Sequence, residues 1–321
     1  MHGVPQAPIL PAASTRSPPN GFPSPNTFAT VVHAGLSDEL HPTPPVPRVV
    51  GSLLHFTEIR SRFLPHPHDV TVCLPPDYDL NRERRYPVLY LHDGQNVFDE
   101  LAMSPFGVQW GIDTTARALM HAQVIEPMII VAIGNAGRDR IDEYTPTRDN
   151  AHDAGGLADR YGQMLVYELK PWVDQNWRTR RGVRDTGLAG SSLGGLLTLH
   201  LGLTHSAVFG KIGLLSPSVW WDDRWIVRQL VANNGMRPEL KIWLDVGTGE
   251  ARMLKGTRLL YRMLLRKGWQ PGHDLLYMEA DGALHDERAW GERSGLFLRF
   301  LFPAMSSSVD VLAMSMSSGM S

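Results

Sequence analysis

The stretch GSSLGG at residues 190–195 follows the apolar run TGLA at 186–189 and precedes the apolar run LLTL at 196–199. This order predicts a buried strand, a tight turn and then a helix, with Ser192 at the apex of the turn. The glycines at both ends of the turn have no Cβ, so strand and helix can approach each other closely. A hydroxyl held at this apex lies beside the free amides and the positive dipole end of the new helix. We therefore interpret Ser192 as a nucleophile.

Length and composition favour one large α/β domain. The chain has 321 residues, of which 43% are hydrophobic and 20% charged, and its formal net charge is −2. A near-neutral chain without a run of Lys and Arg argues against nucleic acid as the main partner. We expect no membrane partner, because no run approaches the ~18 apolar residues of a membrane span. The start of the chain lacks the basic and apolar regions of a secretory signal, so we expect a cytoplasmic protein.

The chain divides into a central folded region and two ends of biased composition. Residues 1–47 are rich in Pro and Ser, and residues 304–321 in Ser and Met, so we expect a disordered leader and a flexible tail. Apolar and helical patterns fill residues 48–303, which we predict to be one catalytic domain. The single cysteine, Cys73, lies in an apolar run and is expected to be a buried hydrophobe.

The apolar patterns predict strands that follow one another closely at first and later alternate with helices. The predicted strands cover 53–59, 69–74, 88–91, 128–133, 185–189, 212–215, 241–246 and 275–280. The predicted helices cover 111–122, 155–177, 194–203, 221–232, 254–267 and 288–302. The later strands lack polar alternation, as expected for parallel strands covered on both faces. We predict the α/β-hydrolase fold: a mostly parallel central sheet with helices on both faces and an antiparallel N-terminal lead-in.

A serine nucleophile needs a general base, which in turn needs a carboxylate to orient it. In a fold of this kind the carboxylate follows the serine and the histidine comes last. His285 lies in the loop DGALHDE at 281–287, just past the last predicted strand, and is the candidate base. Its neighbour Asp286 is expected to be the N-cap of the following helix.

Two carboxylates compete for the orienting position. Glu250 ends the loop GTGE at 247–250, whose glycines would let it reach across to the imidazole. Asp245 lies inside the preceding apolar run and could face either the site or a neighbouring strand. We predict Glu250 as the orienting acid and keep Asp245 as the alternative.

Two backbone amides are expected to bind the negative oxygen that develops during acyl transfer. The first belongs to Leu193, directly after the serine. The second is expected in the turn after the strand at 88–91, where Gly94 permits an unusual backbone conformation. The Gln95 amide is the candidate donor, with Gly94 or Asn96 as alternatives.

Aromatic side chains near the expected mouth of the site could bind substrate. Trp220 and Trp221 follow the predicted strand at 212–215, and Trp110 follows the oxyanion turn. Asn96, a polar residue of the oxyanion turn, is a further candidate for binding substrate. An exposed indole would offer a stacking face to an aromatic acyl group or a sugar, whereas a buried one would pack the core.

Charged residues near the site have a structural interpretation as well. Arg138 and Arg140 could hold an anionic group, but pairing with the carboxylates of residues 142–143 is the preferred interpretation. His92 and Asp93 are adjacent at a strand end and therefore point in opposite directions. Because no second cluster completes a site, we expect no metal and no cofactor.

Five sequence blocks match a known family in order. They are YPVLYLHDGQN at 86–96, RIDEYTP at 140–146, AGSSLGG at 189–195, SPSVWW at 216–221 and GALHDERAW at 282–290. Together they resemble the putative esterase family of α/β-hydrolases. That family includes feruloyl and acetylxylan esterases, enterochelin-type siderophore esterases, S-formylglutathione hydrolases and mycolyltransferases. The resemblance covers about residues 49–303, and the Pro-rich leader has no counterpart in it.

The resemblance implies a serine hydrolase that cleaves a small-molecule carboxylic ester. Carried onto this sequence, the family pattern implies Ser192, Glu250 and His285 as a catalytic triad without a metal. It does not choose the substrate or the oligomeric state, because the members differ in their loops. The alternative function is an acyltransferase that uses the same triad and passes the acyl group to a sugar or another alcohol.

Overall fold

The computed structural model describes residues 47–50, 52–99 and 107–304. The predicted leader and tail lie almost entirely outside these ranges and stay predictions. Cys73 is buried, as expected. Within the described ranges no helix combines the length and apolar character needed to cross a bilayer. The cytoplasmic location stays a prediction.

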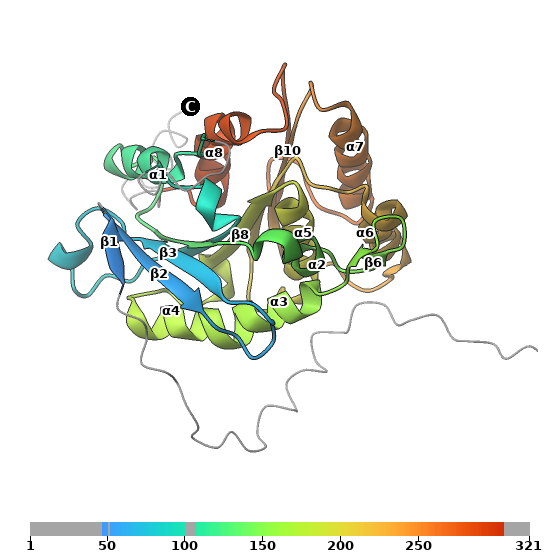
Figure 1. Cartoon of the computed structure of the whole chain (residues 1–321). Helices are drawn as coiled ribbons and strands as arrows, with labels where there is room; N and C mark the ends of the chain where they lie inside the picture. Colours follow the sequence, from blue (N-terminus) through green and yellow to red (C-terminus); the bar gives the residue numbers. More distant parts are fainter. Residues whose placement is uncertain (1–46, 51, 100–106, 305–321) are drawn as a thin grey trace, which may run out of the picture.

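A nine-stranded sheet forms the centre of the molecule (Figure 1). Its spatial order is β1-β2-β3-β5-β4-β8-β9-β10-β11. The strands are β1 Arg48–Val50, β2 Leu53–Ile59, β3 His68–Cys73, β4 Val88–His92, β5 Ile129–Ile133, β8 Thr186–Ser191, β9 Lys211–Leu215, β10 Lys241–Gly247 and β11 Leu275–Ala280. Pairing is antiparallel from β1 to β5 and parallel from β5 to β11. The predicted antiparallel lead-in and parallel array are therefore both present.

Helices cover both faces of this sheet. They are α1 Ile112–His121, α2 Arg140–Tyr144, α3 Ala158–Met164, η5 Leu165–Leu169, α4 Lys170–Asn176, α5 Leu193–Thr204, α6 Trp221–Ala232, α7 Ala251–Arg266 and α8 Glu287–Leu301. Residues of α1 and α8 share one apolar core with Leu89 and Leu91 of β4. Residues of α3 to α7 share the other core with Val88 and Tyr90 of the same strand. Both faces of β4 are buried, which explains why its sequence lacks polar alternation.

The helix predicted over 155–177 begins later and is not uniform. The first residue of the predicted helix, Gly155, belongs instead to a short hairpin formed by β6 Arg148–Asp149 and β7 Ala154–Gly155. Its φ of +103° is not helical. Between α3 and α4, η5 is a π-helical turn. Pro171, in the first turn of α4, has no amide hydrogen for the regular i→i−4 bond, and the wider turn before it accommodates this loss. The hairpin, β1 and α2 were not predicted.

The turn between β8 and α5 is a point of close backbone contact. A Cβ added to Gly190 would lie 2.8 Å from the carbonyl carbon of Gly194, and one added to Gly194 would lie 3.3 Å from the Cβ of His92. Only glycine fits at the first of these positions without moving the backbone. The elbow predicted from the spacing of the glycines is therefore present, and it lies at the carboxyl end of β8.

The contact at Gly190 gives a test of this packing. We expect Gly190→Ala to lower the free energy of unfolding by about 1–3 kcal/mol, because the methyl group would overlap the α5 backbone. Gly182→Ala is the matched control, since its φ of −69° suits alanine and its Cβ would meet only Asp185 Oδ2 at 3.5 Å. Urea denaturation of both variants measures the difference. Equal stability of the two variants would show that the elbow tolerates a side chain there.

Candidate active site

Ser192 is held in a conformation that few residues adopt. It is the N-cap of α5, with φ 55° and ψ −120°. Its amide donates to Leu215 O of β9 (3.0 Å), and its carbonyl accepts from the Ser218 amide (2.9 Å). Backbone strain of this kind costs about 1–3 kcal/mol and persists where the surroundings fix it. The two hydrogen bonds to β9 and the loop after it fix the position of the serine.

Three side chains form one hydrogen-bonded line. His285 Nε2 lies 2.9 Å from Ser192 Oγ, and His285 Nδ1 lies 2.5 Å from Glu250 Oε2. A neutral imidazole whose Nδ1 donates to the carboxylate has Nε2 free to accept from the serine hydroxyl. The Glu250 side chain is 1% exposed and that of His285 33% exposed. The carboxylate is thus shielded from water while the imidazole faces the solvent side of the site.

The loops that carry acid and base pack directly on each other. Gly249 N donates to Ala283 O (3.1 Å), and Thr248 N donates to Ala280 O (2.9 Å). Asp286 Oδ1 accepts from the amide of Ala289 (2.9 Å), which confirms it as the N-cap of α8. Since the cap directly follows His285, the start of α8 fixes the backbone that carries the imidazole.

The second oxygen of Glu250 has its own donors. Glu250 Oε1 accepts from Ser216 Oγ (2.7 Å) and from the Gly247 amide (2.8 Å). Ser216 Oγ in turn accepts from Trp290 Nε1 (3.1 Å) and Arg293 Nη2 (3.3 Å), both on α8. Charge-assisted hydrogen bonds of this kind set the orientation of a carboxylate. Sequence reasoning missed Ser216, although it opens the block SPSVWW just after β9. It also missed Arg293, which lies within a predicted helix and has no local signal of its role.

Asp245 has different partners and does not reach the imidazole. It is fully buried inside β10, where its carboxylate accepts from Trp243 Nε1 (2.7 Å) and Arg293 Nε (3.1 Å). Burial raises the pKa of Asp245, although Arg293 opposes the shift. Of the two candidate acids, Glu250 is therefore the one placed against His285.

The predicted oxyanion turn is the 3₁₀ turn η2, Gly94–Asn96, which follows β4. The hypothetical Cβ of Gly194 would lie 3.2 Å from Asp93 Oδ2, so this turn is adjacent to the start of α5. Leu193 is the first residue of α5, and its amide has no acceptor within the helix. The amide of Asn96 donates to Asp93 O (2.9 Å) and is already used. Gln95 and Gly94 remain as candidates for the second donor.

Asp93 anchors this turn. Its two carboxylate oxygens accept from Arg140 Nε (2.6 Å) and Nη2 (2.7 Å), and Oδ1 also accepts from Asn135 Nδ2 (2.6 Å). The expected pairing of Arg140 with residues 142–143 was therefore wrong. A bidentate pair with a buried carboxylate fixes both partners more rigidly than neighbouring residues on one helix could.

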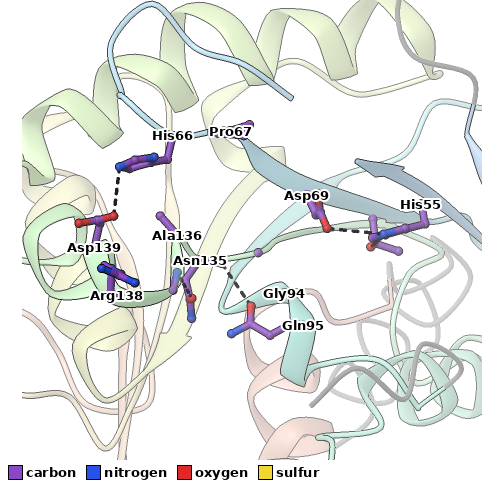
Figure 2. Close-up of a pocket in the computed structure, with 13 residues that line it drawn as sticks. His55, His66, Pro67, Asp69, Gly94, Gln95, Asn135, Ala136, Arg138 and Asp139 are labelled. Carbon is purple, nitrogen blue, oxygen red and sulfur yellow. Dashed lines mark hydrogen bonds and ion pairs between the residues drawn. The ribbon is translucent and has the colours of Figure 1, made fainter. Parts of the chain in front are cut away.

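A pocket of about 840 Å³ opens beside the oxyanion turn (Figure 2). Gln95 Oε1 accepts from the Asn135 amide (3.2 Å) at its floor. His66 and Asp139, whose side chains lie 3.1 Å apart, form one wall, and exposed Arg138 lies next to them. The side chain of Gln95 is thus held in the pocket while its peptide belongs to the turn.

Of the predicted substrate-binding residues, only Trp220 is partly exposed. Trp221 is 2% exposed and donates from Nε1 to Thr147 O (3.0 Å). Trp110 is 4% exposed and packs against Trp290. Of the two interpretations given for these indoles, packing in the core therefore holds for Trp221 and Trp110. Asn96 is also buried, and its side chain bonds to Glu287 Oε1 (3.3 Å).

His92 and Asp93 face different neighbours, as their adjacent positions predict. His92 Nδ1 lies 3.2 Å from Tyr161 Oη, and burial lowers the pKa of His92 to about 4. Among the residues that the structure describes, no group of three or more His, Cys, Asp or Glu side chains is placed to hold a metal ion.

Comparison with known proteins gives a family and several relatives. A family model described as Putative esterase matches residues 61–292. The chain is 28% identical over 232 residues to the uncharacterized protein YbbA of Bacillus subtilis (strain 168), covering 68% of this chain and 86% of YbbA. It is 29% identical over 225 residues to the iron(III) enterobactin esterase of Escherichia coli (strain K12), covering 68% of this chain and 49% of that protein. The chain thus spans about half the length of the enterobactin esterase.

Solved structures share the fold. The BES protein from Bacillus cereus matches with a TM-score of 0.62 at 22% identity, covering 84% of this chain and 99% of that one. A ferulic acid esterase matches with a TM-score of 0.61 at 19% identity, covering 78% and 97%. These likenesses confirm the fold predicted from the sequence.

The buried pair of Asp245 and Arg293 gives a test of the network behind the site. Arg293→Met would leave the Asp245 carboxylate buried without its cation, so we expect the free energy of unfolding at pH 7 to fall by about 3–5 kcal/mol. Burial raises the pKa of Asp245 above its unfolded value, so the folded variant binds a proton more readily than the unfolded chain. The loss should therefore shrink as the pH falls from 7 to 5.

Urea denaturation of parent and variant at both pH values measures this loss. Arg288→Met, at an exposed position on the same helix, is the control and should change stability by no more than about 0.5 kcal/mol. An Arg293→Met loss as small as the control, or one that grows at pH 5, would contradict the assignment of a buried ion pair.

Proposed function

Since the chain belongs to the Putative esterase family and is a carboxylic ester hydrolase, we propose that it cleaves its ester through a covalent acyl-enzyme on Ser192. His285 is the general base and Glu250 orients it. The observation that carries this proposal is the hydrogen-bonded line from Ser192 Oγ through both imidazole nitrogens to Glu250 Oε2, at 2.9 and 2.5 Å. This is the geometry that activates a serine hydroxyl at neutral pH.

In the first half of the reaction, Ser192 Oγ attacks the ester carbonyl carbon. Its proton passes to His285 Nε2, and the imidazolium that forms is stabilised by the Glu250 carboxylate on Nδ1. The carbonyl oxygen becomes an oxyanion, for which the amides of Leu193 and Gln95 are the proposed donors. The bond from carbon to the alcohol oxygen then breaks, and that oxygen takes the proton from Nε2.

In the second half, water takes the place of the alcohol. His285 Nε2 accepts a proton from the water as its oxygen attacks the acyl carbon. The bond from that carbon to Ser192 Oγ then breaks, and Nε2 returns the proton to Oγ. The products are a carboxylic acid and free enzyme. The one-third exposure of His285 supports this step, because water must reach the imidazole.

The relatives support ester cleavage as the reaction and leave the substrate open. One is named for iron(III) enterobactin and a structural neighbour for ferulic acid, which present different acyl and alcohol groups. The serine, its base and its acid act in the same way on any carboxylic ester, so they do not select the substrate. We therefore propose a small-molecule ester as substrate, with the specific groups set by the pockets beside Ser192.

Removal of the nucleophile tests the proposal directly. Ser192→Ala should lower the turnover of a p-nitrophenyl ester at least about 10³-fold while the protein stays folded, because no other group can form the acyl-enzyme. A fluorophosphonate probe should label the parent on Ser192 and leave the variant unlabelled, as measured by mass spectrometry.

Ser218→Ala is the matched control for this variant. Its hydroxyl lies 3.3 Å from Ser192 Oγ but outside the line to His285 and Glu250. We expect it to keep the probe reaction and to lose less than about tenfold in turnover. If Ser192→Ala cleaved the ester at the parent rate, or if the probe labelled another serine, the proposal would be wrong.

The orienting acid is tested separately. Glu250→Gln should lower kcat by about 10²- to 10⁴-fold, because an amide at this position no longer favours the tautomer and charge that His285 needs. Asp281→Asn, a carboxylate of the neighbouring loop that bonds to Thr248 Oγ1 (3.2 Å), is the control and should change kcat little. The measurement is kcat of the parent and both variants, with matching near-UV circular dichroism spectra as evidence that all three proteins are folded alike. Full activity of Glu250→Gln would remove this residue from the mechanism.

A further inference from the structure

A second pocket, of about 710 Å³, lies between the start of α6 and the N-terminal part of α7. Trp220 lines it together with four cationic side chains: Arg224, Arg252, Lys255 and Arg262. Figure 1 shows α6 and α7 beside each other at the end of the sheet that carries β10. The pocket beside the oxyanion turn is lined by residues of β2 and β3 and of the turns after β4 and β5, which lie on the other side of β8 in the sheet order. The two pockets therefore flank the nucleophile.

Among the residues that the structure describes, the four cations of the second pocket have no acidic partner. None of them forms an ion pair within the part of the chain that the structure describes. Arg258 on the same helix does, with two hydrogen bonds to Glu279 at 2.8 and 2.7 Å. The acidic side chain of the pocket wall, Asp223, bonds instead to Arg228 (3.0 Å). The pocket thus keeps a net positive charge while nearby arginines are neutralised.

The four cations are exposed side chains that lie on two facing walls of the pocket. Arg252, Lys255 and Arg262 follow one another at spacings of three and seven residues, which places them on one side of α7. Arg224 comes from the opposite wall, on a segment at 222–224 whose three φ angles are positive. Like charges brought together in a concave site raise the local positive potential and attract an anion.

One guanidinium is prepared to receive a planar anion. The Cζ of Arg252 lies 3.9 Å from the centroid of the Trp220 ring. A guanidinium stacked on an indole keeps the N–H groups of its edge free, and these match the two oxygens of a carboxylate. Stacking also restricts the long side chain before the anion binds, which lowers the entropy cost of binding.

The pocket walls are continuous in sequence with the loops that carry Ser218 and Glu250. Ser218 Oγ lies 3.3 Å from Ser192 Oγ, and Trp220 is two residues further along the chain. Two residues span at most about 7 Å. On the other wall, Ala251 directly follows Glu250. The loops that position the hydroxyl and the carboxylate therefore continue directly into the walls of the pocket.

We propose that this cationic pocket is a subsite for a free carboxylate carried by the ester whose carbonyl Ser192 attacks. This inference rests on the proposed function and narrows its substrate class to anionic esters. The carboxylate would lie against Arg252 and Trp220, with Arg224, Lys255 and Arg262 supplying further charge. The bond that breaks and the groups that move protons stay those of the proposed reaction.

Matched ester pairs test the subsite. The first pair is mono-p-nitrophenyl adipate and p-nitrophenyl hexanoate, which differ by a carboxylate on the acyl side. The second is 3-(4-acetoxyphenyl)propanoate and 4-propylphenyl acetate, which differ by a carboxylate on the alcohol side. The quantity measured is the ratio of kcat/KM for the anionic ester to that for the neutral ester. In at least one pair, Lys255→Glu should lower this ratio about tenfold, and 0.5 M NaCl should lower the ratio of the parent.

Arg266→Glu is the matched control, because it makes the same charge change on an exposed position of α7 outside the pocket. Its ratio should stay within about twofold of the parent. If Lys255→Glu and Arg266→Glu gave the same ratio in both pairs, the subsite would be overturned while the proposed function stood. If the parent cleaved none of the four esters, or cleaved them without Ser192, the proposed function itself would fail.

Discussion

The close approach of β8 and α5 is the constraint on which the site depends. With 2.8 Å between the added Cβ position of Gly190 and the carbonyl carbon of Gly194, the turn has no room for a side chain at its first residue. Within this tight turn Ser192 has a φ of 55°, and its hydroxyl lies beside the Leu193 amide at the start of α5. Every residue of β8 is buried, so the packing of the strand offsets the local strain.

Helix α8 connects the base to the buried charges behind it. It starts at the cap residue next to His285, and further along Trp290 and Arg293 both donate to Ser216. Ser216 then donates to Glu250, while the guanidinium also holds Asp245. Helix α8 thus orients both side chains. Its first residues fix the backbone of His285, and its later residues hold Ser216, whose hydroxyl orients the Glu250 carboxylate. Two buried acids can coexist here because each has its own donors.

The sequence predicted the fold and the central line of the site because both depend on local signals. The glycine spacing around Ser192 and the positions of Glu250 and His285 after strands follow directly from chain order. The partners of Ser216 and Asp93 could not be predicted in this way. Their hydrogen bonds join residues 34 to 77 positions apart, so only the tertiary fold brings them together. Trp221 is buried and Trp220 is partly exposed, although the two are adjacent in the sequence, so the sequence did not show which of them packs in the core.

The placement of the two pockets suggests how such a site becomes selective without changing its chemistry. The pocket beside Gln95 is lined by neutral side chains and by charges of both signs, whereas the pocket beside Trp220 is mainly cationic. An ester bound at Ser192 directs its acyl and alcohol parts away from the carbonyl carbon on different sides. Pockets that differ in charge on the two sides of β8 therefore favour one orientation of an asymmetric substrate, because reversing it would move an anion away from its counter-charges. The loops after β5 and the start of α7 can then vary the substrate while Gly190, Ser192 and His285 keep their geometry.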